Sequence, residues 1–85
     1  MTYKVILSRQ AHNYYARLPR DLARQLSEAI DSLESDPHPL GSKPLTGEFE
    51  GLLRIRVRHL RVVYQVQQDL GRIRIVDIGP RGDVY

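Results

Sequence analysis

The feature that most constrains the fold of this 85-residue chain is a run of alternating arginine and aliphatic residues in its last third. Residues 52–66 read LLRIRVRHLRVVYQV, in which an isoleucine and a valine separate Arg54, Arg56 and Arg58. Successive side chains of a β-strand point to opposite faces, so we expect these three arginines on one face and the aliphatic residues on the other. The run therefore predicts a sheet with one covered apolar face and one basic face.

Together with this run, the remaining residues predict two helices and four strands. In chain order we expect a strand at 3–7, helices at 9–18 and 20–35, a loop at 37–47, and strands at 52–58, 60–67 and 72–78. Ser8 is placed to cap the first helix, and Pro19 suits the first turn of the second. The second helix carries an apolar stripe at helical spacing, which consists of Leu22, Leu26, Ala29, Ile30 and Leu33. The predicted fold is α+β in the order β-α-α-β-β-β, with both helices packed on a mainly antiparallel four-stranded sheet, in a single domain of residues 1–85.

Composition excludes several classes of protein. The hydrophobic fraction of 41% suits a compact globular chain, and the lack of cysteine removes disulfides and thiolate zinc sites. No stretch approaches the roughly 18 apolar residues of a membrane span, and the first residues do not resemble a secretion signal. The three histidines lack a metal-ligand spacing, and no glycine loop suited to a phosphate cofactor stands out. We therefore expect a soluble cytoplasmic protein without metal, cofactor or membrane contact.

Positive charge is concentrated in the second part of the chain. Residues 1–50 contain six Lys or Arg and seven Asp or Glu, whereas residues 51–85 contain seven Arg and three Asp. Arginine offers fixed N–H donors that match phosphate, and a tyrosine such as the terminal Tyr85 can stack on a base. This combination indicates RNA as a partner, although a solvated sheet face or a face that pairs with an acidic protein would have the same charge pattern.

Three segments resemble the RelE/ParE superfamily of toxin–antitoxin toxins, in particular the RelE-type mRNA interferases. They are KPL at residues 43–45, GLLRIRVRHLRVVYQV at 51–66 and IGPRGDVY at 78–85. The resemblance implies the β-α-α-β-β-β fold and a ribosome-dependent endoribonuclease. In that activity a ribose 2′-OH attacks the adjacent phosphate of mRNA in the ribosomal A site without a metal ion.

The resemblance also assigns roles to individual residues. Arg54 and Arg56 fall where the family commonly has two catalytic lysines, and Arg61 falls at a phosphate-binding arginine. Arg81 matches an arginine linked to leaving-group chemistry, and Tyr85 matches a tyrosine that stacks on or orients the substrate base. Arg58 has no family counterpart and is interpreted as a solvated residue near a turn.

The departure from lysine at Arg56 leaves the general base unidentified. Arginine is effectively always protonated, so we expect Arg54, Arg56, Arg61 and Arg81 to form an electrostatic cage while another group transfers the proton. His59 at the turn is one candidate. Glu48 is another, and it would share a face with Glu50 if that segment were extended. The alternative for both residues is an ordinary turn or surface role, which the sequence favours.

Two other functions remain open from the sequence. One is a ParE-like toxin that inhibits DNA gyrase without nuclease activity, and the other is an inactive toxin that acts in a DNA-bound antitoxin complex. The resemblance implies a RelB-like antitoxin, the ribosome with mRNA, and operator DNA reached only through the antitoxin complex. We expect the antitoxin to mask Arg54, Arg61 and Arg81 directly.

Overall fold

The computed structural model describes residues 2–81, which form five strands, two α-helices and two short 3-10 helices. In chain order these are β1 (Lys4–Leu7), α1 (Arg9–Ala16), α2 (Arg20–Ser32), β2 (Lys43–Pro44), η1 (Gly47–Phe49), β3 (Leu53–Val57), β4 (Leu60–Gln67), η2 (Gln68–Leu70) and β5 (Arg72–Pro80).

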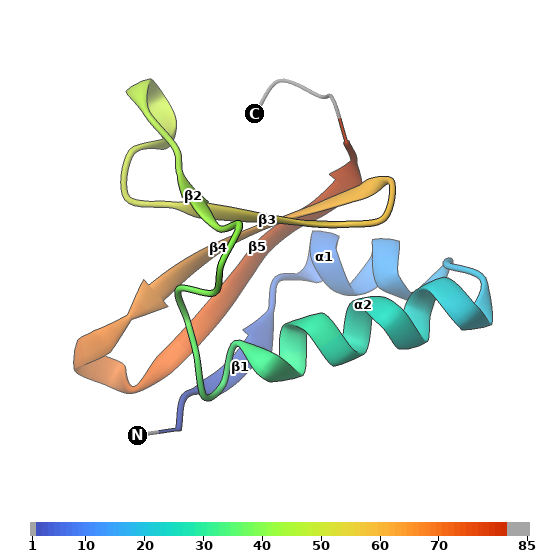
Figure 1. Cartoon of the computed structure of the whole chain (residues 1–85), viewed down its shortest axis with the longest axis horizontal. Helices are drawn as coiled ribbons and strands as arrows, with labels where there is room; N and C mark the ends of the chain where they lie inside the picture. The colour runs from blue at the N-terminus through green and yellow to red at the C-terminus, as the bar shows by residue number, and fades with distance from the viewer. Residues whose placement is uncertain (1, 82–85) are drawn as a thin grey trace.

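The strands form one mixed sheet in the order β1-β5-β4-β3-β2. β1 and β5 are parallel, and every other neighbouring pair is antiparallel. Both helices lie on one side of the sheet, whereas η1 lies on the other side (Figure 1). The α+β prediction is therefore confirmed, except that the described sheet has five strands instead of four. The additional strand is β2, a two-residue segment within the predicted loop.

The core lies between the helices and one face of the sheet. The stripe on α2 is confirmed, because Leu26, Ile30 and the adjoining Leu33 are at most 5% exposed. Facing them are the inward residues of the strands, including Ile55, Val62, Tyr64, Ile73 and Ile75. Burial of this apolar face is the main favourable contribution to folding, at roughly 25 cal/mol per Å².

The first helix is tied to β5 through its capping residue. The Ser8 hydroxyl accepts a hydrogen bond from the Ala11 N–H and donates one to the carbonyl of Val76, at 3.1 and 2.8 Å. The predicted cap is therefore confirmed. Val76 is the extra residue of a β-bulge in β5, since Val63 pairs with Asp77 but the next residue, Tyr64, pairs with Ile75.

The turn between β3 and β4 corrects the predicted path of the arginine run. Arg58 has a φ of 59°, a left-handed conformation that ends the strand after Val57. Arg54 and Arg56 share a face as predicted, but Arg58 leaves the alternation and lies exposed in the turn. The prediction that all three arginines share one strand face was therefore wrong for Arg58.

Other predicted boundaries also change. α1 ends at Ala16 instead of residue 18, α2 ends at Ser32 instead of residue 35, and β5 continues to Pro80. Pro19 precedes the first turn of α2 as its N-cap. Glu48 lies in η1 and Glu50 caps it, so the segment is not extended and the condition for these two carboxylates to share a strand face is not met.

Tyr64 makes a pH-dependent contribution to stability. Its hydroxyl donates a 2.7 Å hydrogen bond to the carbonyl of Pro37. Burial raises the pKa of the Tyr64 phenol, a hydrogen bond with Ser42 lowers it, and the charge of Asp36 raises it further. The protonated phenol is therefore favoured in the folded state, and this stabilisation is present below the unfolded pKa of about 10 and lost as the pH rises through the folded pKa.

We expect Tyr64→Phe to lower the free energy of unfolding at neutral pH by about 1–2 kcal/mol, because the hydrogen bonds of the phenol with Pro37 and Ser42 are lost. Above about pH 10 the difference between the wild-type protein and the variant should shrink. Denaturant unfolding at several pH values measures both effects. A difference that stays constant into the alkaline range would contradict the assignment of this titration to Tyr64.

Candidate functional site

Three arginines, on β3 and β4, lie on the sheet face opposite the helices. Arg54 pairs with Val63, Arg56 pairs with Arg61, and Arg61 in turn pairs with Gly79 on β5. Residues that are directly opposite in neighbouring strands project from the same face. Arg54, Arg56 and Arg61 therefore share the face that the helices leave uncovered, the arginine face.

Arg54 is a buried cation on this face. It is 9% exposed, and its side chain forms neither an ion pair nor a hydrogen bond within residues 2–81. Burial lowers the pKa of Arg54, and the positive charges of Arg56 and Arg81 lower it further. The same finding places Arg56 and Arg81 close enough to Arg54 for mutual repulsion. A buried charge without a counter-charge is unfavourable, so this position suits an external anion.

A cleft of about 270 Å³ opens beside Arg54 and Arg56. Lys43 lines it as well, because Lys43 is the register partner of Arg54 in β2. Leu40, which is fully exposed, forms part of its apolar lining. The cleft is therefore lined by three cationic residues, Lys43, Arg54 and Arg56, and by an apolar residue at its edge. This combination suits a phosphate that is attached to a less polar group.

Arg81 reaches the arginine face from the end of β5. Its backbone N–H donates a 2.7 Å hydrogen bond to the carbonyl of His59 in the β3–β4 turn. The exposed Arg81 side chain is 3.4 Å from the carbonyl of Arg58, in the same turn. The structure therefore joins the backbone of Arg81 to that of His59, and the charge of Arg81 acts on Arg54.

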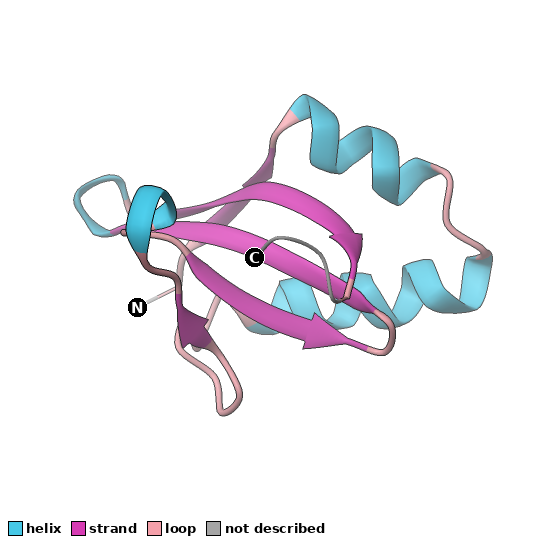
Figure 2. Cartoon of the chain, turned by 90° about the horizontal axis from the view of Figure 1, so that it is seen from above, coloured by secondary structure: helices cyan, strands magenta, loops and turns pink. Residues whose placement is uncertain are grey.

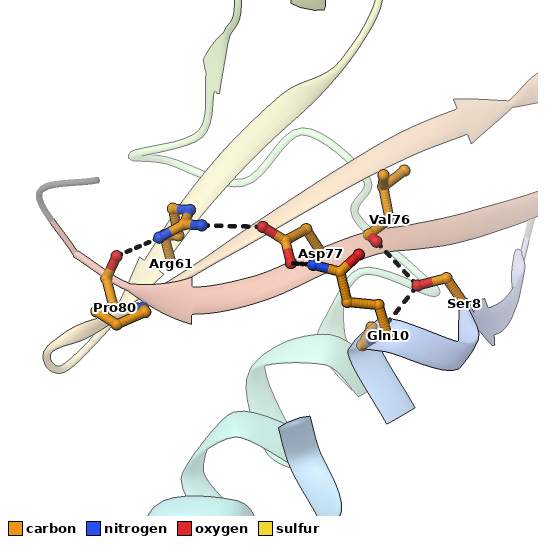
Figure 3. Close-up of polar contacts among 7 residues, drawn as sticks. Ser8, Gln10, Arg61, Val76, Asp77 and Pro80 are labelled. Carbon is orange, nitrogen blue, oxygen red and sulfur yellow. Dashed lines mark hydrogen bonds and ion pairs between the residues drawn. The ribbon is translucent and has the colours of Figure 1, made fainter. Parts of the chain in front are cut away.

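Arg61 differs from the other arginines because it is buried and paired. Only 5% exposed, it donates from Nη2 to Asp77 Oδ2 at 2.9 Å and from Nη1 to the carbonyl of Pro80. The second oxygen of Asp77 accepts a 2.9 Å hydrogen bond from Gln10 of α1. Figure 3 shows this chain of contacts, which extends from the helix to the strand end that carries Arg81. Arg61 thus belongs to an internal network.

The remaining sequence candidates are not assembled in one place. Figure 2 shows η1, which contains Glu48, at one end of the sheet and the β3–β4 turn with His59 at the other. Glu48 therefore lies near the start of β3, whereas Arg81 binds the turn that follows the end of β3. Tyr85, predicted to orient the substrate base, lies outside the described residues.

Sequence reasoning missed Lys43 and Asp77. Lys43 belongs to the KPL segment, but only its register with Arg54 brings it to the cleft. Asp77 follows the apolar pattern of β5, and the bulge at Val76 turns it to the arginine face. The sequence did contain an indication of this role for Asp77, because it is a lone carboxylate in a strand that is rich in isoleucine.

No group of three or more His, Asp or Glu residues that could hold a metal ion occurs in the part of the chain that the structure describes. Within the same residues, no helix is long and apolar enough to cross a membrane.

Comparison with known proteins identifies the class of protein with this fold and basic face. The model of the ParE toxin of type II toxin–antitoxin systems, parDE, matches residues 5–85. Toxin RelE of Mycobacterium tuberculosis is 34% identical over 84 residues, which cover 98% of this chain and 86% of that protein. This protein is therefore a RelE-like toxin of a type II toxin–antitoxin system and belongs to the ParE toxin family, within the RelE/ParE superfamily.

Solved structures agree with the fold. The archaeal RelE–RelB complex from Pyrococcus horikoshii contains a chain that matches with a TM-score of 0.80 and 32% identity, over 98% of this chain and 99% of that one. The toxin–antitoxin complex RelBE2 from Mycobacterium tuberculosis matches with a TM-score of 0.84 and 22% identity, over 95% and 100% of the two chains. The second likeness concerns the fold alone.

Replacement of Arg54 should separate stability from function. We expect Arg54→Met to raise the free energy of unfolding by roughly 1 kcal/mol, because an unpaired buried charge is removed while the apolar stem is retained. The control Arg56→Met, at an exposed position, should stay within about 0.5 kcal/mol of wild type.

Denaturant unfolding with and without inorganic phosphate measures both effects. Phosphate should stabilise the wild-type protein, which binds the anion when folded, and should stabilise Arg54→Met less. A clear destabilisation by Arg54→Met would contradict the view that Arg54 lacks a counter-charge in the free protein.

Proposed function

We propose that this toxin is a ribosome-dependent endoribonuclease that cleaves mRNA in the ribosomal A site. The observation that carries the proposal is the buried Arg54 side chain, which lacks a partner within residues 2–81. Arg56 and Arg81 add positive charge at the same place. A phosphodiester supplies the negative charge and the several acceptor oxygens that such a cluster can bind.

In the proposed reaction the ribose 2′-oxygen attacks the phosphorus of the adjacent phosphodiester, and the bond from phosphorus to the 5′-oxygen of the next nucleotide breaks. The 2′-hydroxyl gives its proton to a base, and the departing 5′-oxygen gains one. The products are a 2′,3′-cyclic phosphate and a 5′-hydroxyl. Negative charge develops on the phosphorane oxygens and on the leaving oxygen, so positive groups that are already in place lower the barrier.

The arginines supply this charge without transferring protons. Arg54 and Arg56 would bind the phosphorane oxygens, and Arg81 would stabilise the leaving 5′-oxygen. Guanidinium groups stay protonated in proteins, which suits an electrostatic role and excludes that of a general base. Loss of one such donor typically costs about 2.7–4 kcal/mol of transition-state stabilisation.

Proton transfer requires a different side chain. His59 is the better placed of the two candidates, because its carbonyl binds the Arg81 N–H, whereas Glu48 lies toward the other end of β3. Imidazole both accepts and donates protons near neutral pH. The role of Tyr85 in orienting the base stays a proposal that rests on the resemblance alone. The substrate also implies the cytoplasm, where ribosomes translate mRNA.

We expect the purified toxin to cleave mRNA at A-site codons in a reconstituted translation reaction. Arg81→Ala and Arg56→Ala should each lower the cleavage rate by about 10²–10³-fold, because each removes a donor to the transition state. Mapping of mRNA 5′ ends measures the cleavage, with a ribosome-free reaction and Arg17→Ala, a change at the exposed C-cap of α1, as controls.

Intact mRNA in the presence of folded toxin would contradict the proposed nuclease activity. The match to the ParE family model makes gyrase inhibition the next candidate, which a DNA supercoiling assay tests. If neither mRNA nor gyrase is affected, the function that remains is that of an inactive toxin, which reaches operator DNA through its antitoxin.

We also propose a RelB-like antitoxin as the partner, because the relative from Pyrococcus horikoshii forms a RelE–RelB complex. An acidic antitoxin segment that covers the arginine face would neutralise Arg54 and block access of mRNA. Arg61 is already paired with Asp77, so we expect direct masking to fall on Arg54, Arg56 and Arg81.

Charge reversal on the arginine face tests this masking. Arg56→Glu should weaken binding of the cognate antitoxin by at least about tenfold, because like charges would then meet at the interface. Arg17→Glu, at the C-cap of α1, is the matched control and should have little effect. Isothermal titration calorimetry measures both, and equal weakening by the two changes would rule out masking at the arginine face.

A further inference from the structure

Arg61 of β4 and Asp77 of β5 form a buried ion pair near the C-terminal end of β5. Their side chains are 6% and 8% exposed, and the Nη2–Oδ2 distance is 2.9 Å. Gln10 holds the other carboxylate oxygen of Asp77. The pair is therefore anchored to the body of the protein through α1, as Figure 3 shows.

Gly79 leaves the space that the guanidinium occupies. A Cβ atom at this position would lie 2.8 Å from Nη2 and 2.9 Å from Nη1 of Arg61, closer than such contacts occur. The side chain of Arg61 thus crosses the strand at Gly79 and reaches the carbonyl of Pro80. Any side chain at position 79 would push the guanidinium out of this arrangement.

The peptide group between Pro80 and Arg81 is consequently held at both ends. Its carbonyl oxygen accepts a hydrogen bond from Arg61, and its N–H donates to the carbonyl of His59 at 2.7 Å. A planar peptide group with both polar atoms bound has a defined orientation. That orientation determines the direction in which the chain presents the Cα of Arg81, and hence its side chain.

We propose that the Arg61–Asp77 pair is a positioning device, which orients the Pro80–Arg81 peptide group so that the Arg81 guanidinium points at the scissile phosphate. Arg61 then acts through Arg81, without itself contacting the phosphate. This inference rests on the proposed function for its substrate. Its structural part, the fixed orientation of the peptide group, can be measured without any RNA.

The first test variant is Gly79→Ala, which displaces the Arg61 guanidinium and removes no charge. The second is the double variant Arg61→Met/Asp77→Leu, which replaces the ion pair with apolar side chains. Replacement of both partners of a buried pair is often neutral for stability, whereas loss of one partner is not. Arg74→Met, which removes an exposed arginine elsewhere on β5, is the matched control.

The first readout is hydrogen exchange of the Arg81 amide, followed by NMR. The amide should be protected in the wild-type protein and in Arg74→Met, and it should lose protection in both test variants. Protection that survives in both test variants would overturn the proposal. This result is independent of nuclease activity, so it stands even if the toxin does not cleave mRNA.

The second readout is the cleavage rate in the translation reaction. Gly79→Ala should lower kcat by about 10²-fold, the effect of a small misplacement of a catalytic group. Combined with Arg81→Ala, it should cause no further loss, because both changes remove the same interaction. Losses that multiply in the combined variant would mean that Arg61 contacts the phosphate itself, and would overturn the positioning role.

Discussion

One additional residue in β5 determines which side chains reach the arginine face. Strict alternation would place Asp77 on the same face as Ile73 and Ile75, within the core. The bulge at Val76 shifts the alternation by one residue, so Asp77 turns outward to Arg61 while Ile78 returns to the core. Because Ser8 binds the bulge carbonyl, the start of α1 and the charge pattern of the sheet depend on one local irregularity.

Two arginines on neighbouring strands illustrate opposite uses of a buried charge. Arg61 has an internal counter-charge in Asp77, and the pair holds the strand end in place. Arg54 has none within residues 2–81 and is surrounded by further positive charge. The first arrangement favours a rigid framework, whereas the second reduces the stability of the free protein and favours occupation by an anion.

The layers of the fold could be predicted because helical and strand periodicities are local properties of the sequence. The stripe of α2 and the cap at Ser8 are examples. The end of the arginine alternation at Arg58 could not be predicted, since the pattern itself continues into the turn. Lys43 and Asp77 join the site only through strand register and a bulge, which depend on contacts between distant residues.

The two-residue strand β2 also affects how the molecule behaves at high concentration. Leu45 donates to the carbonyl of Leu52, so by the alternation of an antiparallel ladder the nitrogen of Pro44 faces away from β3. Proline has no N–H there, and Lys43 adds charge at the same edge. An edge strand of a second molecule therefore finds no N–H donor at Pro44 and meets the charge of Lys43. Both features protect this edge against the edge-to-edge strand pairing that leads to aggregation.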